Sequence, residues 1–467
     1  MILRPKQLEL NAAATEEARK GHKAILIQAA TGFGKSVCAT AQIKTALSRG
    51  KKCLFVVPKR DLVRQMSATF TEFGIPHSFI AAGKQFNPFS NVHIATVGSL
   101  VNRLDKIKPD VVFIDETHVG ASQLDKIIRH YKSKGAWIIG LSATPKRLDG
   151  RGLNCWYDSM VRGPSIRWLI DNKFLADYRL FQPSIPDLSG IKTVGGDFAK
   201  GALNERMEND RVLIGNAVQH YKTHALGKAN VAFCTSIKHS ELVCEEFNAR
   251  GIPAKSIDGT MSDDERRRLI RSFAMRETLV LCSVDLLHTG FDLASNAGMP
   301  VTVECMSDLR PTKSLALQLQ KWGRVLRYKP EPAIIFDHAG NCLNKDGTPN
   351  HGFPCEEREW TLESSEKSSN IQGEKVTKAK QCGICFFCHP PAPSCPNCGH
   401  IYEVQSREIE EIEGDLVELD RDAMRRIAKV EQSTARTLDQ LIELGRQRGY
   451  KNPSFWAAKV MSGRNAR

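Results

Sequence analysis

The sequence predicts an α/β protein in which two parallel-sheet lobes follow one another, with a small cysteine-rich ribbon and a helical tail after them. Three observations predict this fold class. Short apolar runs alternate with amphipathic stretches in two successive series. Five of the 14 cysteines crowd between Cys382 and Cys398, and the stretch from residue 403 onward has helical spacing. A chain of 467 residues is also long enough for more than one hydrophobic core.

The first lobe is predicted from apolar runs that have the length of buried strands. The segments between the runs are long and amphipathic, as the crossover helices of a parallel sheet must be. We place this lobe at residues 1–169. Its expected strands are KAILIQA (23–29), KCLFVVP (52–58), VHIAT (92–96), VVFIDE (111–116) and WIIGLSAT (137–144).

The second lobe, placed at residues 170–345, follows a hinge near Ile170. Gln182 to Phe198 is rich in Pro, Gly and Ser and is interpreted as an irregular connection rather than core. The expected strands are NVAFCTS (230–236), PAKSIDG (253–259), ETLVLCS (277–283), VTVECM (301–306) and AIIFDHAG (333–340).

Beyond the lobes the apolar periodicity weakens. Residues 346–380 are interpreted as a linker, because Glu363 to Lys380 is polar and rich in Ser and Lys. A ribbon at 381–402 and a basic helical module at 403–467 complete the predicted organisation.

The stretch ILIQAATGFGKSVCATAQIKTAL has the order strand, glycine-rich turn, helix. Such a turn points backbone N–H groups at a phosphate, and the positive end of the helix stabilises it. Lys35 would reach the β- and γ-phosphates of ATP, and the Ser36 hydroxyl would bind Mg²⁺. The strict phosphate-loop pattern has Gly where this chain has Ala29, so a turn without a phosphate is the alternative.

An apolar strand ending in two carboxylates, VVFIDETH, follows the phosphate loop. A Mg-nucleotide site needs this arrangement, with Asp115 holding the metal through water and Glu116 orienting the attacking water. Taken alone, an Asp-Glu pair at a strand end is usually a solvated turn. Paired with the phosphate loop, it predicts ATP hydrolysis.

Arg324 and Arg327 are three positions apart in QLQKWGRVLR and therefore share one side of a helix. Two guanidinium groups there can approach the γ-phosphate of ATP bound to the other lobe and stabilise the charge that develops during hydrolysis. Gln320 lies one turn earlier on the same side. A solvated basic helix end is the alternative.

These and other stretches, in this order, resemble the motifs of the superfamily 2 helicases and translocases of the DEAD/DEAH type, over about Leu3 to Asn341. The matching stretches are LRPKQ, the phosphate loop, VVPKRDLVRQ, ATVGSL, DETH, LSATP, CSVDLLHTGFDL and QLQKWGRVLR. The resemblance implies two RecA-like lobes that close on ATP and step along a nucleic-acid strand.

The resemblance also implies roles for individual residues. For ATP and Mg²⁺ these are Arg4, Gln7, Thr31, Gly32, Gly34, Lys35, Ser36, Asp115, Glu116, His118, Ser142, Thr144, Gly290 and Asp292. For catalysis they are Glu116, Lys35, Arg324, Arg327 and Gln320. For the nucleic-acid backbone they are Lys59, Arg60, Thr96, Ser99, Thr235 and Ser283, each of which could instead be a helix cap or a surface polar residue.

Two Cys-x-x-Cys pairs stand in CGICFFCHPPAPSCPNCGH. Four thiolates at this spacing suit tetrahedral Zn²⁺, which makes Cys382, Cys385, Cys395 and Cys398 the expected ligands. Cys388, His389 or His400 could replace one of them. Structural thiols or a redox pair are the alternatives to a metal.

The tail stretch RQRGYKNPSFWAAKV interleaves basic residues with Tyr450, Phe455 and Trp456, a mixture that suits phosphate contact and base stacking. A small helical module with its own aromatic core is the alternative. A ribbon and a basic tail after two motor lobes resemble the RadD-like branch and related phage helicases. That branch implies DNA as the substrate, single-stranded, forked or branched, in replication, recombination or repair.

A formal net charge of +14 also favours a polyanionic partner. The N-terminal MILRPKQLEL lacks the features of a signal peptide and no apolar run could cross a membrane, so we expect a cytoplasmic protein of a bacterium or a phage-infected cell. No protein partner is indicated. Two other functions stay open: an RNA helicase of the same fold, since the motor motifs do not read the sugar, and a nucleic-acid-binding scaffold that clamps without unwinding.

Overall fold

The computed structural model describes residues 3–147, 151–183, 185–284, 293–344, 348–363, 380–402, 431–432, 434–448 and 452–465. Residues up to Tyr402 form one compact unit, and Glu403 to Arg467 form a second. Gly290, Asp292, Tyr450 and most of the polar linker lie outside the described residues.

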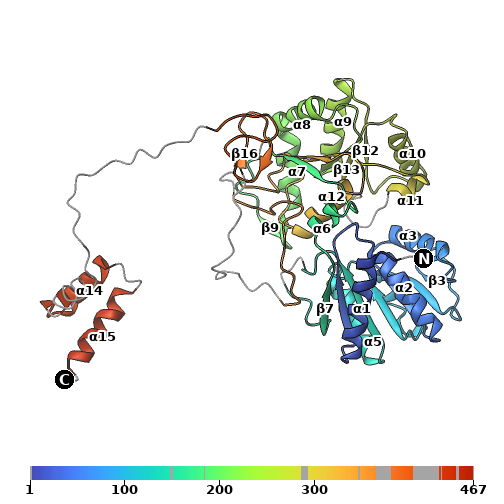
Figure 1. Ribbon diagram of the computed structural model, residues 1–467, viewed down its shortest axis with the longest axis horizontal. Helices are drawn as coiled ribbons and strands as arrows, with labels where there is room; N and C mark the ends of the chain where they lie inside the picture. Colours follow the sequence, from blue (N-terminus) through green and yellow to red (C-terminus); the bar gives the residue numbers. More distant parts are fainter. Residues whose placement is uncertain are drawn as a thin grey trace. The chain divides into compact units, whose positions relative to one another are not determined.

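The first lobe is built on a seven-stranded parallel sheet (Figure 1), with strand order β3-β4-β2-β5-β6-β1-β7. Its strands are β1 (Ala24–Gln28), β2 (Cys53–Val57), β3 (Ser78–Ile80), β4 (Val92–Thr96), β5 (Val111–Ile114), β6 (Trp137–Ser142) and β7 (Ser159–Arg162). The main helices are α1 (Pro5–Arg19), α2 (Lys35–Ser48), α3 (Arg60–Glu72), α4 (Val97–Leu100) and α5 (Ala121–Ser133). The RecA-like order of the central strands brings the carboxyl ends of β1, β5 and β6 together, which is where a doubly wound sheet binds ligands.

The second lobe carries a six-stranded parallel sheet of order β12-β13-β11-β14-β15-β8. Its strands are β8 (Tyr178–Phe181), β11 (Asn230–Cys234), β12 (Ala254–Ile257), β13 (Val280–Val284), β14 (Cys305–Asp308) and β15 (Ala333–Asp337). Its helices are α7 (Lys200–Asn209), α8 (Arg211–His224), α9 (Ile237–Ala249), α10 (Asp263–Ala274), α11 (Leu293–Ala297) and α12 (Leu315–Val325). The short helix α6 (Ile166–Asp171) leads from one lobe to the other.

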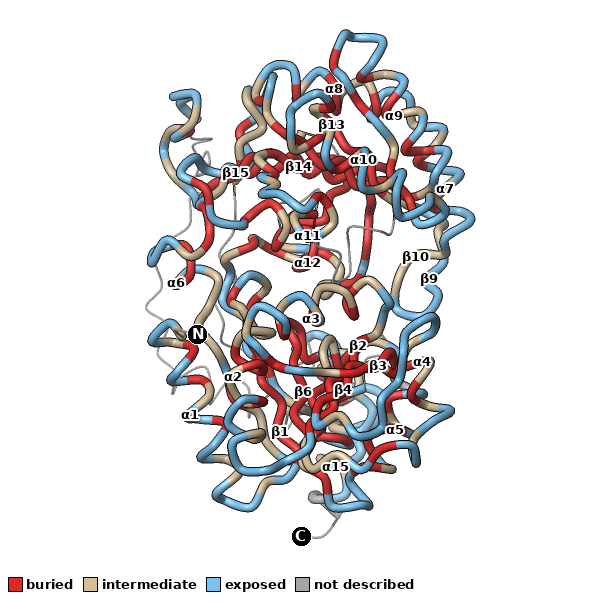
Figure 2. The backbone as a smooth tube through the Cα atoms, turned by 90° about the vertical axis from the view of Figure 1, so that its right-hand side faces the viewer, coloured by how far each residue is buried: buried red, intermediate tan, exposed pale blue. Residues whose placement is uncertain are grey.

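Burial is concentrated on the strands, as Figure 2 shows. Alternate residues of β2 enter different clusters: Phe55 packs with α2 and α3, whereas Leu54 packs with α5. Each sheet is therefore covered on both faces, which explains why its strands have continuous apolar runs. One cluster extends from Phe33 in the first lobe to Trp322 in the second, so the lobes share hydrophobic contacts beside the connection between them.

All ten predicted strands are present in the two large sheets, which also contain three strands that were not expected, β3, β7 and β8. β3 and β7 are the edges of the first sheet and β8 is an edge of the second. In β7 only Val161 is buried, because an edge strand is not enclosed on all sides. β14 begins at Cys305, later than the VTVECM stretch indicates.

Two connecting segments are more ordered than the sequence indicates. Within Gln182–Phe198, the short strands β9 (Thr193–Val194) and β10 (Asp197–Phe198) pair, and the Phe198 side chain packs against the second-lobe core. The described part of the predicted linker, 348–363, returns to the first lobe, where the backbone N–H of Leu153 donates to the carbonyl oxygen of Leu362 at 2.7 Å. Trp360 of this segment is buried.

The ribbon pairs β16 (Lys380–Gln381) with β17 (Cys388–His389) and packs on the second lobe. The N–H of Gln182 donates to the carbonyl oxygen of Phe386 at 3.2 Å, and the rings of Phe181 and Phe387 lie 5.5 Å apart.

In the C-terminal unit, α14 (Leu438–Gln447) packs against α15 (Pro453–Asn465). A Cβ at Gly445 would lie 3.2 Å from the Trp456 ring, whereas Phe455 is 69% exposed. Trp456 therefore belongs to the module's own core, as the alternative interpretation has it, and Phe455 is accessible to a partner.

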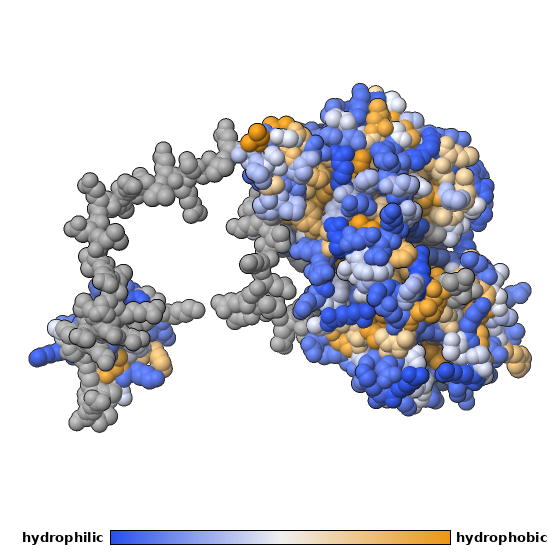
Figure 3. Space-filling model, viewed as in Figure 1, coloured by the Kyte–Doolittle hydropathy of each residue, from blue (hydrophilic) through white to orange (hydrophobic). Residues whose placement is uncertain are grey.

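Hydrophilic residues predominate on the face shown in Figure 3, with hydrophobic ones interspersed. Among the described residues, no helix is both long and apolar enough to cross a bilayer.

Candidate nucleotide site and interlobe cleft

The phosphate loop lies between β1 and α2. Gly32 and Gly34 have φ values of +87° and +95°, in the left-handed region that glycine adopts without strain. A Cβ at Gly34 would also lie 2.6 Å from the Nε2 atom of Gln7. Ala29 is fully buried and faces Gly163, where a Cβ would lie 3.0 Å from the Ala29 methyl group. Glycine at 163 thus makes room for alanine at the position where the strict pattern has glycine.

Lys35 begins α2, and its Nζ atom donates to the carbonyl oxygen of Ala29 at 3.1 Å, across the loop. Ser36 and Thr31 are partly accessible. The ammonium group therefore lies over the turn into which the backbone N–H groups and the start of α2 would direct a phosphate.

Asp115 and Glu116 follow β5 directly. The N–H of Glu116 donates to Asp115 Oδ1 at 3.0 Å. Burial, and then the neighbouring Glu116 carboxylate, raise the pKa of Asp115 to about 7, while Lys35 opposes the rise. Glu116 has a φ of 47°, which is uncommon for a residue with a side chain and typical of sites held under strain for function.

His118 joins this carboxylate pair to the next strand. Its Nδ1 atom lies 3.0 Å from Ser142 Oγ and 3.5 Å from Glu116 Oε2. Ser142 Oγ in turn donates to the carbonyl oxygen of Thr144 at 2.8 Å. Burial lowers the pKa of His118. A neutral imidazole therefore connects the ends of β5 and β6.

Arg4 and Gln7, the expected adenine readers, lie at the start of α1. Gln7 is buried; its Oε1 accepts from the Arg4 N–H at 3.0 Å and its Nε2 donates to the carbonyl oxygen of Phe33 at 2.9 Å. The Arg4 guanidinium lies 4.5 Å from the centre of the Phe174 ring. Gln7 thus links α1 to the phosphate loop, and Arg4 contacts the segment between the lobes.

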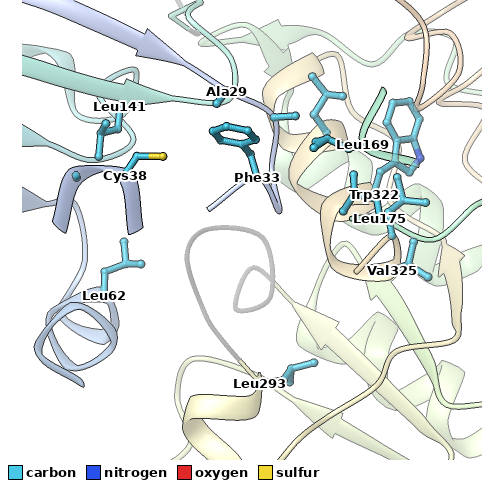
Figure 4. Packing of buried hydrophobic residues seen from close by; sticks show 14 of the residues in the cluster. Ala29, Phe33, Cys38, Leu62, Leu141, Leu169, Leu175, Leu293, Trp322 and Val325 are labelled. Carbon is cyan, nitrogen blue, oxygen red and sulfur yellow. The ribbon is translucent and has the colours of Figure 1, made fainter. Parts of the chain in front are cut away.

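Helix α12, which contains Gln320 and Arg324, lies against the phosphate loop. A Cβ at Gly323 would lie 2.3 Å from Thr31 Cγ2, so the backbone of α12 lies directly against the loop. Figure 4 shows Trp322 and Val325 beside Leu175, with Phe33 and Ala29 nearby in the first lobe. Gln320 is buried, Arg324 is half-buried and Arg327 is exposed.

A cavity of about 750 Å³ lies between the lobes, and six of its lining residues are basic. We call it the basic opening. The expected backbone-binding residues Lys59 and Arg60 are exposed there. The sequence interpretation missed four further basic residues of this lining: Arg64, Lys84, Arg266 and Arg267. Arg64 lies in the VVPKRDLVRQ stretch, and Arg266 and Arg267 lie in the basic run DDERRRLIR, which the sequence analysis did not use.

Two ion pairs cross this opening. Arg64 of α3 lies 3.0 Å from Asp263 of α10, and Arg266 of α10 lies 4.0 Å from Asp61 of α3. Arg64 and Asp263 are 38% and 51% exposed, so their pair contributes little to stability, whereas Arg266 and Asp61 are more buried but lie at the limit of an ion pair. The two pairs do place α3 and α10 face to face across the basic lining.

Three of the four hydroxyl residues expected to bind the nucleic-acid backbone are buried within the protein. Thr96 caps α4, accepting from the Ser99 N–H at 3.3 Å. Thr235 Oγ1 lies 3.1 Å from His239 Nδ1, and Ser283 is fully buried. In this arrangement of the lobes the accessible phosphate-binding groups are the basic ones, and the half-buried Ser99 is the most accessible of the four hydroxyl residues.

The four expected metal-binding cysteines come together. The Sγ atoms of Cys382, Cys385, Cys395 and Cys398 all lie within 4.8 Å of one another. Cys388 is excluded from the cluster: its thiol is buried and directed at the carbonyl oxygen of Phe386. A cluster of four thiols fits a tetrahedral Zn²⁺ ion with no open position, as in structural sites.

The two histidines near the cysteine cluster are not among the groups that could hold the metal. The ring nitrogens of His389 bond to the Tyr402 hydroxyl group and to the carbonyl oxygen of Pro390. His400 is exposed, and its ring packs against Tyr402. The side-chain amide of Asn397 donates to Cys385 Sγ at 3.3 Å. Such a hydrogen bond orients a metal-binding sulfur atom without itself contacting the metal.

Two family models match the two lobes. The model described as "Type III restriction enzyme, res subunit" matches residues 1–147, and the model described as "Helicase conserved C-terminal domain" matches residues 213–329.

Curated relatives extend the similarity over most of the chain. A 51.5 kDa protein of a Lactococcus phage is 32% identical over 408 residues, covering 84% of this chain and 83% of that protein. A Saccharomyces cerevisiae protein named as a candidate ATP-dependent helicase is 28% identical over 405 residues, covering 81% of this chain and 58% of that protein. The chain thus spans little more than half the length of the yeast relative.

Solved structures share the fold of the two lobes. A type ISP restriction-modification enzyme bound to DNA aligns with a TM-score of 0.55 and 15% identity, over 74% of this chain and 28% of that one. A DEAD-box helicase bound to single-stranded RNA aligns with a TM-score of 0.52 and 17% identity, over 73% and 70%. The ordered motifs, the two family models and the curated relatives together show that the chain belongs to helicase superfamily 2 and is an ATP-hydrolysing enzyme of that family.

Proposed function

We propose that this protein is an ATP-dependent DNA helicase or translocase, in which closure of the two lobes on ATP drives movement along a DNA strand. The contact of Gly323 in α12 with Thr31 in the phosphate loop carries the proposal. It is a contact between the lobes at the place where the nucleotide would be bound. Any separation of the lobes would remove Arg324 from that place, so hydrolysis and lobe movement would be coupled.

The residues divide the chemistry among them. Glu116 orients and polarises the attacking water, and Lys35, Arg324 and Arg327 stabilise charge on the phosphates. Asp115 and Ser36 would hold Mg²⁺, which when bound neutralises the phosphate oxygens. Gln320, one turn before Arg324, would act from the same helix.

The basic opening supports a nucleic-acid path beside the nucleotide site. Lys59 and Arg60 from one lobe and Arg267 from the other face the same space, so both lobes could hold the backbone of one strand. Such contacts read phosphates rather than bases and imply little sequence specificity. The cysteine ribbon and the basic tail favour DNA, in a replication, recombination or repair intermediate.

The test is ATP hydrolysis and strand displacement on single-stranded, forked and four-way DNA beside RNA of matched sequence. We expect DNA to stimulate hydrolysis more strongly than RNA, and Lys35→Ala and Glu116→Gln each to abolish it. Stimulation by RNA alone would reassign the enzyme as an RNA helicase. If Glu116→Gln abolished ATP hydrolysis but retained full cellular activity, the result would instead favour a nucleic-acid-binding scaffold.

A further inference from the structure

Beneath α12 lies a fully buried ion pair to which the motor motifs give no role. Lys321 Nζ donates to Asp308 Oδ1 at 2.6 Å and to Oδ2 at 2.8 Å, and both side chains are completely inaccessible. A third bond runs from Lys321 Nζ to the carbonyl oxygen of Arg310 at 3.1 Å. All three donors of the ammonium group are therefore used.

Two amide side chains complete what we call the Asp308 network, consisting of Asp308, Gln318, Lys321 and Asn341. Gln318 Nε2 donates to Asp308 Oδ2 at 2.9 Å, and Asn341 Nδ2 donates to the same oxygen at 3.0 Å. Asp308 is the last residue of β14, and Asn341 follows β15. The network thus joins α12 to the carboxyl ends of two neighbouring strands.

Stability does not explain this network. Moving a lysine and an aspartate out of water costs hydration energy that their attraction only roughly offsets, so apolar side chains of the same size would fold as well. What these directional bonds do supply is one defined orientation of the helix that carries them, although Gln318 Oε1 has no hydrogen-bond partner among the described residues.

The orientation of α12 matters because its opposite side touches the other lobe. Gly323 is two positions after Lys321, which corresponds to a turn of about 200° around the helix axis. Lys321 is therefore held by its own lobe on one side, while Gly323 lies against Thr31 on the other. Arg324 follows Gly323 directly, about 100° further around the axis, and therefore lies between the side of Gly323 and the side of Lys321.

We propose that Lys321 and Asp308, with Asn341, are positioning residues that set the rotation of α12 and thereby place Arg324 at the phosphate loop. This inference rests on the proposed function, in which Arg324 acts on the nucleotide. Lys321 itself touches no substrate, because its charge is enclosed within the second lobe.

The test removes both buried charges together, with the double variant Asp308→Asn/Lys321→Met, so that neither is left unpaired. We expect a melting temperature close to that of the parent, nucleotide affinity within about 2-fold, and kcat for ATP reduced at least about 10-fold. Lys313→Met, at an exposed lysine just before α12, is the matched control and should retain full activity.

A thermodynamic cycle with Arg324→Ala separates positioning from a general loss of structure. If the network acts through Arg324, adding Arg324→Ala to the double variant lowers kcat little further. Multiplicative losses, or full kcat in the double variant, would overturn the inference. Full activity in Arg324→Ala alone would instead overturn the role of that arginine in the proposed function.

Asn341→Ala tests the same inference if the double variant does not fold. It leaves the Lys321–Asp308 pair in place but removes the bonds that Asn341 donates to Asp308 and to the carbonyl oxygen of Arg310, and the bond that it accepts from the Thr312 N–H. We expect a reduction of kcat by a factor of about 3 to 10, with unchanged nucleotide affinity and the same lack of additivity with Arg324→Ala. An unchanged kcat in folded Asn341→Ala would contradict the inference.

Discussion

The α-carbon of Gly323 lies so close to Thr31 that no side chain larger than hydrogen fits between them. The added Cβ would be 2.3 Å from Thr31 Cγ2 and 2.6 Å from Thr31 Cβ. The two residues belong to different lobes, one in α12 and one in the phosphate loop. This contact fixes how near the lobes can come.

Gly323→Ala should therefore hold the lobes apart. The methyl group collides with a β-branched side chain whose χ1 angle is restricted, so α12 or the loop must shift. We expect kcat for nucleic-acid-stimulated ATP hydrolysis to fall by about 10-fold to 100-fold, while nucleotide still binds the first lobe. Steady-state ATPase assays and a fluorescent-nucleotide titration measure the two effects.

The matched control is Gly201→Ala, because Gly201 is also helical and an added Cβ there meets nothing within 4 Å. It should keep full activity. Equal losses in the two variants would show that backbone effects of alanine, rather than the Thr31 contact, explain the result.

Much of this fold could be predicted from the sequence because strands buried on both faces must be apolar throughout. β1, β2, β4 and β5 have every or nearly every residue buried, and their runs stand out from the chain. Edge strands such as β7 have no such signature, because half of their surroundings is solvent or loop.

Some residues of the candidate site could likewise be predicted from the sequence, and others could not. Lys35 and Asp115 could be found because phosphate and Mg²⁺ chemistry demands those residue types next to strand ends. Arg64 and Asp263 could not, because their contact depends on how two separate lobes meet. Lys321 lies between Gln320 and Gly323 of its motif, where a single buried charge leaves no pattern along the chain.

Arg267→Ala should weaken nucleic-acid binding through lost charge. Arg267 lines the basic opening, whereas its exposed neighbour Arg268 does not, so Arg268→Ala is a control on the same helix. If Arg267 contacts one phosphate of a single strand, the slope of log K against log salt concentration should become shallower by about 0.7. Fluorescence anisotropy over a salt series measures it; identical slopes in the two variants would place the strand elsewhere.

Cys395→Ser should remove the bound metal. Cys395 is one of the four clustered thiols, and a hydroxyl group is a much poorer zinc ligand than a thiolate. We expect about one zinc per chain in the parent and a large loss in the variant, by elemental analysis. Cys388→Ala should keep its zinc, because that thiol faces away from the cluster; zinc loss there with retention in Cys395→Ser would reverse the ligand assignment.

His338→Phe should make the protein less sensitive to acid. His338 is completely buried, and neither ring nitrogen has a hydrogen-bond partner among the described residues. Burial, and then the stacked His220, lower its pKa to about 3, whereas the unfolded chain binds this proton near pH 6.5. Stability is therefore present above pH 6.5 and is lost as the pH falls towards the folded-state pKa. Between pH 7.5 and 5.5 the variant should lose about 1–2 °C less in melting temperature than the parent, while His22→Phe, at a half-exposed position, should follow the parent. A variant whose melting temperature falls as steeply as that of the parent would show that this imidazole is charged in the fold.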